Sequence, residues 1–193
     1  MPQTSSVHTP VHVSEKKSQS NYETILYHII EFPGLRFHEL KKEVSIANGT
    51  LQHHISSLVK SGIISVQYDN STPRYFSNKI KPDSQIIIKR LSQITPSKII
   101  KLLLKKECQT FAQLVKYSKK SPGTVSLYKN KLVADRIIIG TTDDCKSCKN
   151  RGVMKIKYRL VEPEKVRALV LEYGKSSLSK SADNLADVFL SLR

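Results

Sequence analysis

Apolar side chains recur every three or four residues in residues 20–31, which is the spacing of a helix that buries one face. Ser20 or Asn21 can cap this helix at its start, and Pro33-Gly34 ends it. The positions expected to point inward are Ile25, Leu26, Ile29 and Ile30.

The same spacing predicts two more helices, at about Arg36–Val44 and Asn48–Ser61, with Asn48 as the cap of the second. Gly62 stops that helix. Two short strands, Ile63–Tyr68 and Arg74–Ser77, follow on either side of a run of turn-forming residues. The inward positions of the two helices are Phe37, Leu40, Val44, Leu51, Ile55 and Leu58.

A shift of the sequence by 74 positions brings this whole pattern onto a second copy without a gap. The matched pairs include Phe37 with Phe111, Leu40 with Leu114, Gly49-Thr50 with Gly123-Thr124, Leu58-Val59 with Leu132-Val133 and Ile63-Ile64 with Ile137-Ile138. An internal repeat identifies the architectural unit, so we expect one small domain used twice. The elements expected in the second copy are helices at Pro96–Lys106, Thr110–Ser118 and Ser121–Asp135 and strands at Ile137–Thr142 and Val153–Leu160.

Three helices followed by a hairpin form the winged helix–turn–helix plan, in which the third helix enters the DNA major groove. The predicted fold class is therefore mainly α with small β-hairpin wings (α+β), with two tandem winged domains and a C-terminal helix. A connecting helix begins after Pro82, capped by Asp83 or Ser84. The expected division is a disordered tail at 1–19, a first winged domain at 20–80, the connecting helix at 81–95, a second winged domain at 96–161 and a C-terminal helical dimerisation segment at 162–193.

The C-terminal segment carries apolar residues at alternating steps of four and three positions, a heptad-like seam. Pro163 suits the first turn of the helix that begins the segment, and Gly174 breaks or bends it. We expect the seam to pair two copies of the chain in a homodimer. Its residues are Leu178, Ala182, Leu185, Phe189 and Leu192.

The chain is strongly basic, with a formal net charge of +16 over 193 residues and a pI near 9.8. Residues 20–95 have a net charge of +3, whereas residues 96–160 have +12. This uneven excess favours nucleic acid as the partner over an anionic membrane or a merely soluble surface. The chain has no apolar run of membrane-spanning length and no signal peptide, so we expect a cytoplasmic protein. No phosphate-binding glycine loop, nucleophile elbow or carboxylate pair indicates an enzyme.

The stretches Thr50–Ile55 and Leu58–Ile64 resemble the recognition helix and wing start of bacterial and archaeal winged-helix regulators, and Ser121–Ser126 resembles the same helix. As a tandem pair over residues 20–160, they are similar to archaeal predicted transcriptional regulators with two helix–turn–helix domains. The resemblance implies a sequence-specific regulator that binds double-stranded DNA as a homodimer. The alternative is an adaptor or accessory factor of chromosome segregation or of the transcription machinery, which binds a protein partner and binds DNA non-specifically. Operator, effector and sign of regulation are not indicated.

In the first copy, the outward face of the third helix is polar and can bond base edges or phosphates. Gln52 can read adenine through two bonds, and His54 is expected to be packed and half-buried rather than paired with His53 on a metal. The DNA-binding candidates of this copy are Asn48, Thr50, Gln52, His53, Ser56, Lys60 and Arg74.

The second copy departs from this pattern. Lys129 takes the position of the inward Ile55, and Leu127 takes that of His53. Two alternatives stay open: the helix is rotated with Tyr128 inward, or its outer face does not read bases. The candidates on this helix are Ser121, Thr124 and Ser126.

The second wing alternates charged and apolar residues, so that Lys155, Lys157 and Arg159 are expected on one strand face, suited to phosphate. Lys146, Lys149 and Arg151 add charge in its loop.

Cys145 and Cys148 form a lone CxxC at the tip of the second wing. A structural zinc site needs four ligands, and the sequence offers no second pair. Three interpretations stay open: inert cysteines, a redox pair favoured by the neighbouring cations, or a zinc site shared across a dimer. We expect no cofactor, with zinc as the less favoured alternative.

Overall fold

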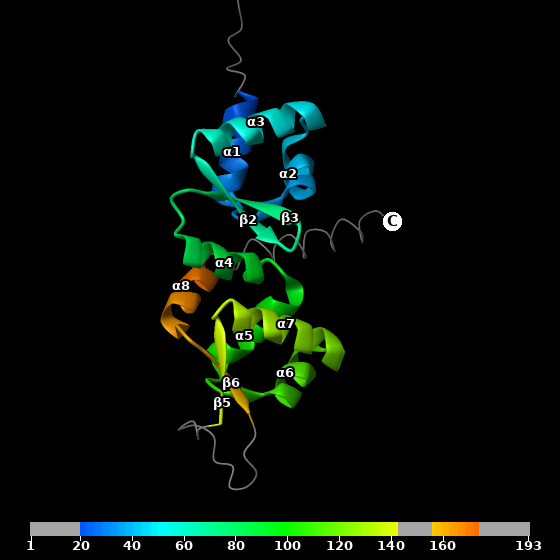
Figure 1. Ribbon diagram of the computed structural model, residues 1–193, viewed down its shortest axis with the longest axis vertical. Helices are drawn as coiled ribbons and strands as arrows, with labels where there is room; N and C mark the ends of the chain where they lie inside the picture. The colour runs from blue at the N-terminus through cyan, green and yellow to red at the C-terminus, as the bar shows by residue number, and fades with distance from the viewer. Residues whose placement is uncertain (1–19, 143–155, 174–193) are drawn as a thin grey trace, which may run out of the picture.

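The computed structural model describes residues 20–142 and 156–173, and within them the same order of elements occurs twice (Figure 1). The first unit contains α1 (Asn21–Glu31), β1 (Leu35–Arg36), α2 (Phe37–Val44), α3 (Asn48–Lys60), β2 (Ile64–Asp69) and β3 (Thr72–Ser77). The second unit contains α5 (Ile94–Lys105), β4 (Gln109–Thr110), α6 (Phe111–Ser118), α7 (Pro122–Ala134), β5 (Ile138–Thr141) and β6 (Lys157–Leu160). Between the units lies α4 (Pro82–Leu91), and α8 (Pro163–Tyr173) follows the second. The predicted α+β class with small wings is confirmed.

Each unit has a three-stranded antiparallel sheet rather than the two-stranded hairpin expected from the sequence. The strand orders are β1-β3-β2 and β4-β6-β5, so that the last strand of each hairpin is the central strand. The additional strands, β1 and β4, are two residues long and lie just before the second helix of their unit. Strands this short carry no detectable alternation, which is why the sequence pattern did not reveal them.

Helix starts follow the predicted caps in some places and not in others. Ser20 caps α1 through a capping box with Glu23, as its hydroxyl chemistry predicts. The prediction for Asn48 is wrong, because Ala47 is the N-cap residue of α3 and Asn48 is the first helical residue. The α4 prediction also fails, since Pro82 occupies the first turn and Lys81 precedes it.

Two hydrophobic cores form, one in each unit, and the inward stripe of α3 is fully confirmed. Leu51 and Leu58 are 0% exposed and Ile55 is 6% exposed. The prediction for Ile30 is wrong: it is 48% exposed, because Ile25 and Ile29 centre the buried stripe and Ile30 lies about 100° further around the helix.

The helix α4 packs mainly with the second unit. Ile87, Ile88 and Leu91 belong to the second core, and Phe76 of β3 joins them there. Tyr75, the neighbour of Phe76 on the same strand, packs into the first core. Because successive residues of a strand point to opposite faces, β3 contributes to both cores and joins the two units.

A buried polar cluster reinforces this junction. The Arg90 guanidinium donates to Asp69 at the end of β2, at 3.0 Å, and to Asp135 after α7. Gln93 also donates to Asp69, at 2.7 Å, and Lys89 donates to the Tyr68 carbonyl, at 3.3 Å. Desolvation by burial lowers the pKa of Lys89, and the carboxylate of Asp135 opposes that shift. The end of the first hairpin is therefore bonded to α4 and its neighbours.

Replacing Arg90 by Ala is expected to lower the free energy of unfolding by about 3–5 kcal/mol, because two nearly buried carboxylates lose their shared cation. Urea unfolding measures the loss. Arg167 is the matched control, since its pair with Glu164 is exposed and Arg167→Ala should cost no more than about 1 kcal/mol. Equal losses in the two variants would contradict a stabilising role for the Arg90 cluster.

Candidate nucleic-acid interface

The turn between α2 and α3 sets the geometry of the helix–turn–helix. Ser45, the C-cap of α2, adopts the left-handed conformation with φ 50°, and its N–H bonds to the Lys41 carbonyl. The chain therefore changes direction within three residues, and α3 begins at Asn48 with its buried stripe against α1 and β2.

The outer face of α3 presents the five polar side chains that the sequence predicted. Asn48, Thr50, Gln52, His53 and Ser56 are all exposed. Apart from the ring contact between His53 and His54, these side chains bond to no other residue in the parts of the chain that the structure describes. Lys60 is exposed at the end of the same helix. Their donors and acceptors are available for the base edges and phosphates of a major groove.

His54 lies beside this face without belonging to it. Its half-buried ring packs edge-on against Tyr22, with 6.4 Å between ring centroids, as the sequence predicted.

No group of three or more potential metal ligands occurs in residues 20–142 or 156–173.

Arg74 is buried, which corrects its assignment to the DNA-binding set. It is 2% exposed, and its Nη1 donates to the Gly34 carbonyl at 2.7 Å and to the Ser92 hydroxyl at 3.1 Å. Burial lowers the pKa of the guanidinium, and neighbouring Arg36 lowers it further. The pairing of β1 with β3 explains the burial, because Arg74 lies on the central strand of its sheet.

The α7 helix of the second unit presents a different surface. Leu127 is 54% exposed, at the position that matches His53, as the sequence predicted. Tyr128 packs partly against the second core, and the Lys129 ammonium lies 5.4 Å from the Tyr158 ring centroid. Tyr128 thus packs partly inward while Leu127 faces outward, which agrees with the rotated helix. Whether the outer face reads bases stays a prediction.

Ser121 and Thr124 form the N-terminal cap of α7. The Ser121 hydroxyl accepts from the Thr124 N–H at 3.3 Å and lies 2.9 Å from the Thr124 hydroxyl. Capping occupies part of their bonding capacity, and Ser126, the third candidate on this helix, is half-buried.

Of the three cations expected on one face of the second wing, the structure describes Lys157 and Arg159, and only Arg159 is exposed as predicted. Arg159 is exposed, but Lys157 is 9% exposed, because β6 is the central strand and Lys157 pairs with both Thr110 and Thr141. The other predicted wing residues lie outside the described residues: Lys146, Lys149, Arg151, Lys155, Cys145 and Cys148.

A basic turn before α7 was missed in the sequence. Lys116, Lys119 and Lys120 are exposed on α6 and in the turn that leads to α7. The partial positive charge of a helix N-terminus adds to theirs, so this surface suits phosphate. A comparison of the charge in corresponding segments of the two repeats would have revealed this basic turn. Residues 94–142 hold ten Lys or Arg and two Asp or Glu, whereas the corresponding residues 20–68 hold four Lys or Arg and four Asp or Glu.

Comparisons with known proteins bear on the first unit, which contains α3. Residues 19–87, just over a third of the chain, match the family model described as HTH_HVO_0163_N, N-terminal HTH domain. This match and the geometry of α2 and α3 identify a helix–turn–helix DNA-binding domain in that region. No protein with curated annotation matches the sequence.

One solved structure that matches is the crystal structure of the DIP2311 protein from Corynebacterium diphtheriae. It is 14% identical, with a TM-score of 0.27, and the alignment covers 73% of this chain and 26% of that one. The chain thus spans about a quarter of that protein's length, and a TM-score of this size does not establish a shared fold. None of the helices that the structure describes has the length and apolar composition needed to cross a membrane.

Replacing Lys119 and Lys120 together by Gln is expected to weaken binding to every duplex alike, because phosphate contacts carry no sequence information. The slope of log K against log salt concentration should flatten by about 0.9 for each phosphate that is no longer neutralised. Fluorescence anisotropy over a salt series measures both effects. The matched control replaces Lys79 and Lys81, an exposed pair after β3, and should leave the slope unchanged; an equal change in both double variants would argue against phosphate binding at the α6–α7 turn.

Proposed function

We propose that this protein is a sequence-specific regulator of transcription that reads double-stranded DNA with α3. The observation that carries the proposal is the outer face of α3, where five exposed polar side chains are presented in helix–turn–helix geometry. Gln52 has the amide geometry that bonds both N6 and N7 of adenine. The helix–turn–helix match to residues 19–87 includes the same helix in a DNA-binding domain.

The second unit takes a different role in this proposal, binding mainly phosphate. Lys116 on α6 and Lys119 and Lys120 in the α6–α7 turn are exposed, and Arg159 adds a cation on the wing. Leu127 occupies the centre of the α7 surface, where the first unit has a base-reading position. Sequence discrimination then comes from the first unit, and the second raises affinity for any duplex.

A homodimer completes this function, because two readers on half-sites one helical turn apart discriminate better than one. The residues proposed to join the chains are Leu178, Ala182, Leu185, Phe189 and Leu192, whose heptad-like spacing supports a helix pair. We place the protein in the cytoplasm, the compartment of such regulators in cells without a nucleus.

The lone CxxC of the wing is proposed as a redox-sensitive addition to this function rather than as a cofactor site. Lys146 and Lys149 flank Cys148, and neighbouring cations lower a thiol pKa and favour disulfide formation. Cys108, the third cysteine, is a thiol buried at 4% exposure in the second unit.

A second candidate function is an adaptor or accessory factor of chromosome segregation or of the transcription machinery that contacts a protein through α7. Leu127 favours it, since an apolar side chain 54% exposed on this helix suits a protein surface better than a base edge. In that case DNA binding would be non-specific, and selection of bound sequences from random duplexes would enrich no consensus.

Replacing Gln52 by Ala is expected to cost about 1–3 kcal/mol on the selected site and to relax its base preference, because alanine cannot form the bidentate bonds to adenine. Sequence selection followed by anisotropy titration measures both. Ser126, the residue that matches Gln52 in the repeat, provides the control, and Ser126→Ala should leave the preference unchanged. An altered preference in Ser126→Ala together with an unaltered one in Gln52→Ala would reverse the division of roles.

Truncation before Leu178 is expected to give a folded monomer that binds its operator much more weakly. The seam lies outside the residues that the structure describes; in the proposed dimer it would bury five apolar side chains per chain, worth several kcal/mol at ~25 cal/mol per Å² before association costs. Light scattering at micromolar concentration compares the two proteins. A full-length monomer, or a truncated dimer, would refute the assignment of the seam.

A further inference from the structure

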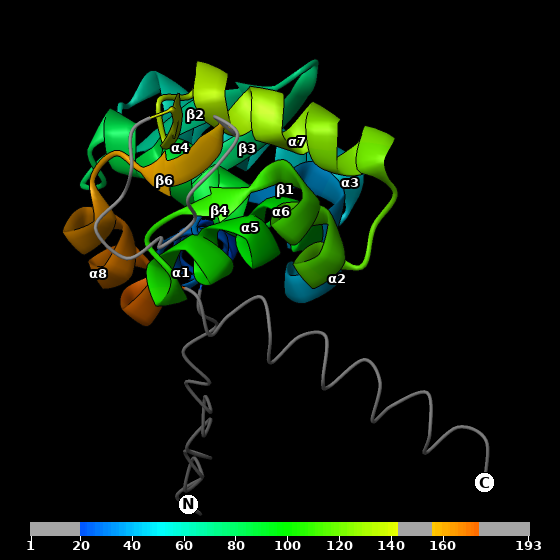
Figure 2. The ribbon, with the colours of Figure 1, turned by 90° about the horizontal axis from the view of Figure 1, so that it is seen from below.

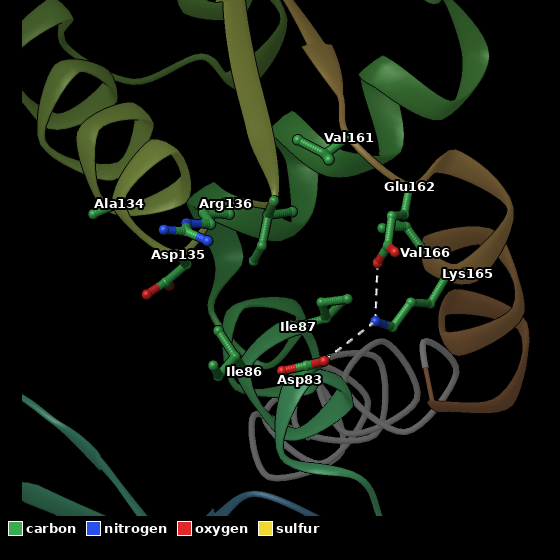
Figure 3. Close-up of a pocket in the computed structure, with 11 residues that line it drawn as sticks. Asp83, Ile86, Ile87, Ala134, Asp135, Arg136, Val161, Glu162, Lys165 and Val166 are labelled. Carbon is green, nitrogen blue, oxygen red and sulfur yellow. Dashed lines mark hydrogen bonds and ion pairs between the residues drawn. The ribbon is translucent and has the colours of Figure 1, made fainter.

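A cleft of about 460 Å³ lies between α4, the end of α7, the start of β5 and α8 (Figure 3). Its floor is apolar and rigidly packed: Ile87 is 5% exposed, Ile137 is 4% exposed and Val166 is 1% exposed. This volume lies in the range of small-molecule sites, which combine an apolar lining with a few polar groups. The cleft takes no part in the DNA-binding surfaces described above.

Most of the charged groups around the cleft already have partners. The Lys165 ammonium lies 2.9 Å from the Glu162 carboxylate and 3.9 Å from that of Asp83, as Figure 3 shows. The Asp135 carboxylate accepts from Arg90 behind the cleft wall. Arg136 differs from these groups, because it lines the cleft and its guanidinium bonds to no other residue in 20–142 or 156–173. The available charge of the cleft is therefore a guanidinium.

The backbone at Arg136 favours glycine rather than arginine. Its φ is 55°, in the left-handed region, where the matching residue of the first unit is Gly62 with φ 68°. The two positions end their helices in the same way: the Gly62 N–H bonds to the Val59 carbonyl and the Arg136 N–H to the Val133 carbonyl, both at 3.0 Å. The helix end does not require an arginine at this position, so the guanidinium is available for a role outside the helix end.

We propose that this cleft binds a small organic carboxylate with a branched or aromatic apolar body. The Arg136 guanidinium would hold the carboxylate through two parallel N–H···O bonds, and the apolar body would cover Ile87, Ile137 and Val166. The three carboxylates that line the cleft already have cationic partners: Lys165 pairs with both Asp83 and Glu162, and Arg90, which Asp69 shares, pairs with Asp135. Arg136 is thus the cation of the lining that remains available to an anionic ligand.

A ligand bound in this cleft would lie next to the contacts that join the two units. Asp135, beside Arg136, is one end of the chain of contacts that runs through Arg90 to Asp69 on the first hairpin. A bound carboxylate would therefore act as an effector on the arrangement of the DNA-binding units. That effect rests on the proposed function, whereas binding to the cleft is measured without DNA, so the two can fail separately.

Isothermal titration of the full-length protein with phenylacetate and with 4-methylpentanoate tests the site. We expect saturable binding of at least one of them, and at least tenfold weaker binding both of phenylacetamide, which lacks the charge, and of acetate, which lacks the apolar body. The absence of saturable binding by both carboxylates, or equal affinity for the amide or for acetate, would overturn the proposal.

Arg136→Gly is the decisive variant, because glycine suits the left-handed backbone at this position and the variant is expected to fold. Its thermal midpoint should stay the same or rise, while carboxylate affinity falls at least tenfold. Ala134→Phe, which narrows the cleft without touching Arg136, should also abolish binding. Arg167→Gln, an exposed arginine of α8 outside the cleft, should bind as the wild type does. Unchanged binding by Arg136→Gly, or an equal loss in Arg167→Gln, would refute the site.

Discussion

The Arg90 guanidinium holds two carboxylates that belong to different units, and the arrangement of the molecule depends on this interaction. Asp69 ends strand β2 of the first hairpin, and Asp135 follows α7. All three side chains are at least four-fifths buried, so each carboxylate would be costly without its cation. The first hairpin is therefore fixed to the second unit, and Phe76, reaching from β3 into the second core, strengthens the same junction.

The two units share their buried positions and their helix ends but differ on their surfaces. Apolar pairs such as Leu58 and Leu132 are both 0% exposed, because any change at a close-packed position costs stability. On the outer faces, by contrast, His53 corresponds to Leu127 and Gly62 to Arg136. Surface substitutions cost little, so each copy was free to acquire its own chemistry. The first copy became neutral and polar along α3, and the second became basic at the turn before α7.

Sequence periodicity predicted the helices well, because each buries one stripe and several have caps with direct local chemistry. It could not predict β1 and β4, which consist of two residues each, and those strands decide what is buried. Once β1 pairs with β3, Arg74 lies on a central strand and is enclosed; once β4 pairs with β6, the same happens to Lys157. Alternation tells which residues share a face of a strand, but not what will cover that face. For this reason the sequence predicted DNA contacts for Arg74 and Lys157, which the structure shows to be buried.

The fixed first hairpin constrains how the protein can approach DNA. A winged domain normally has two points of contact, the third helix and the wing, but here Asp69 and the Tyr68 carbonyl at the wing end are bonded to α4. The first unit is left with α3 and its own turn, and residues 20–68 carry no net charge with which to hold phosphate. Base contacts alone rarely supply affinity, because most of it comes from the DNA backbone. The turn between α6 and α7 lies at one edge of the molecule in Figure 2 and α8 lies at the opposite edge. In the proposed function, contacts to the DNA backbone would therefore come mainly from the second unit, and the Arg90 junction would hold the polar face of α3 in place relative to that unit.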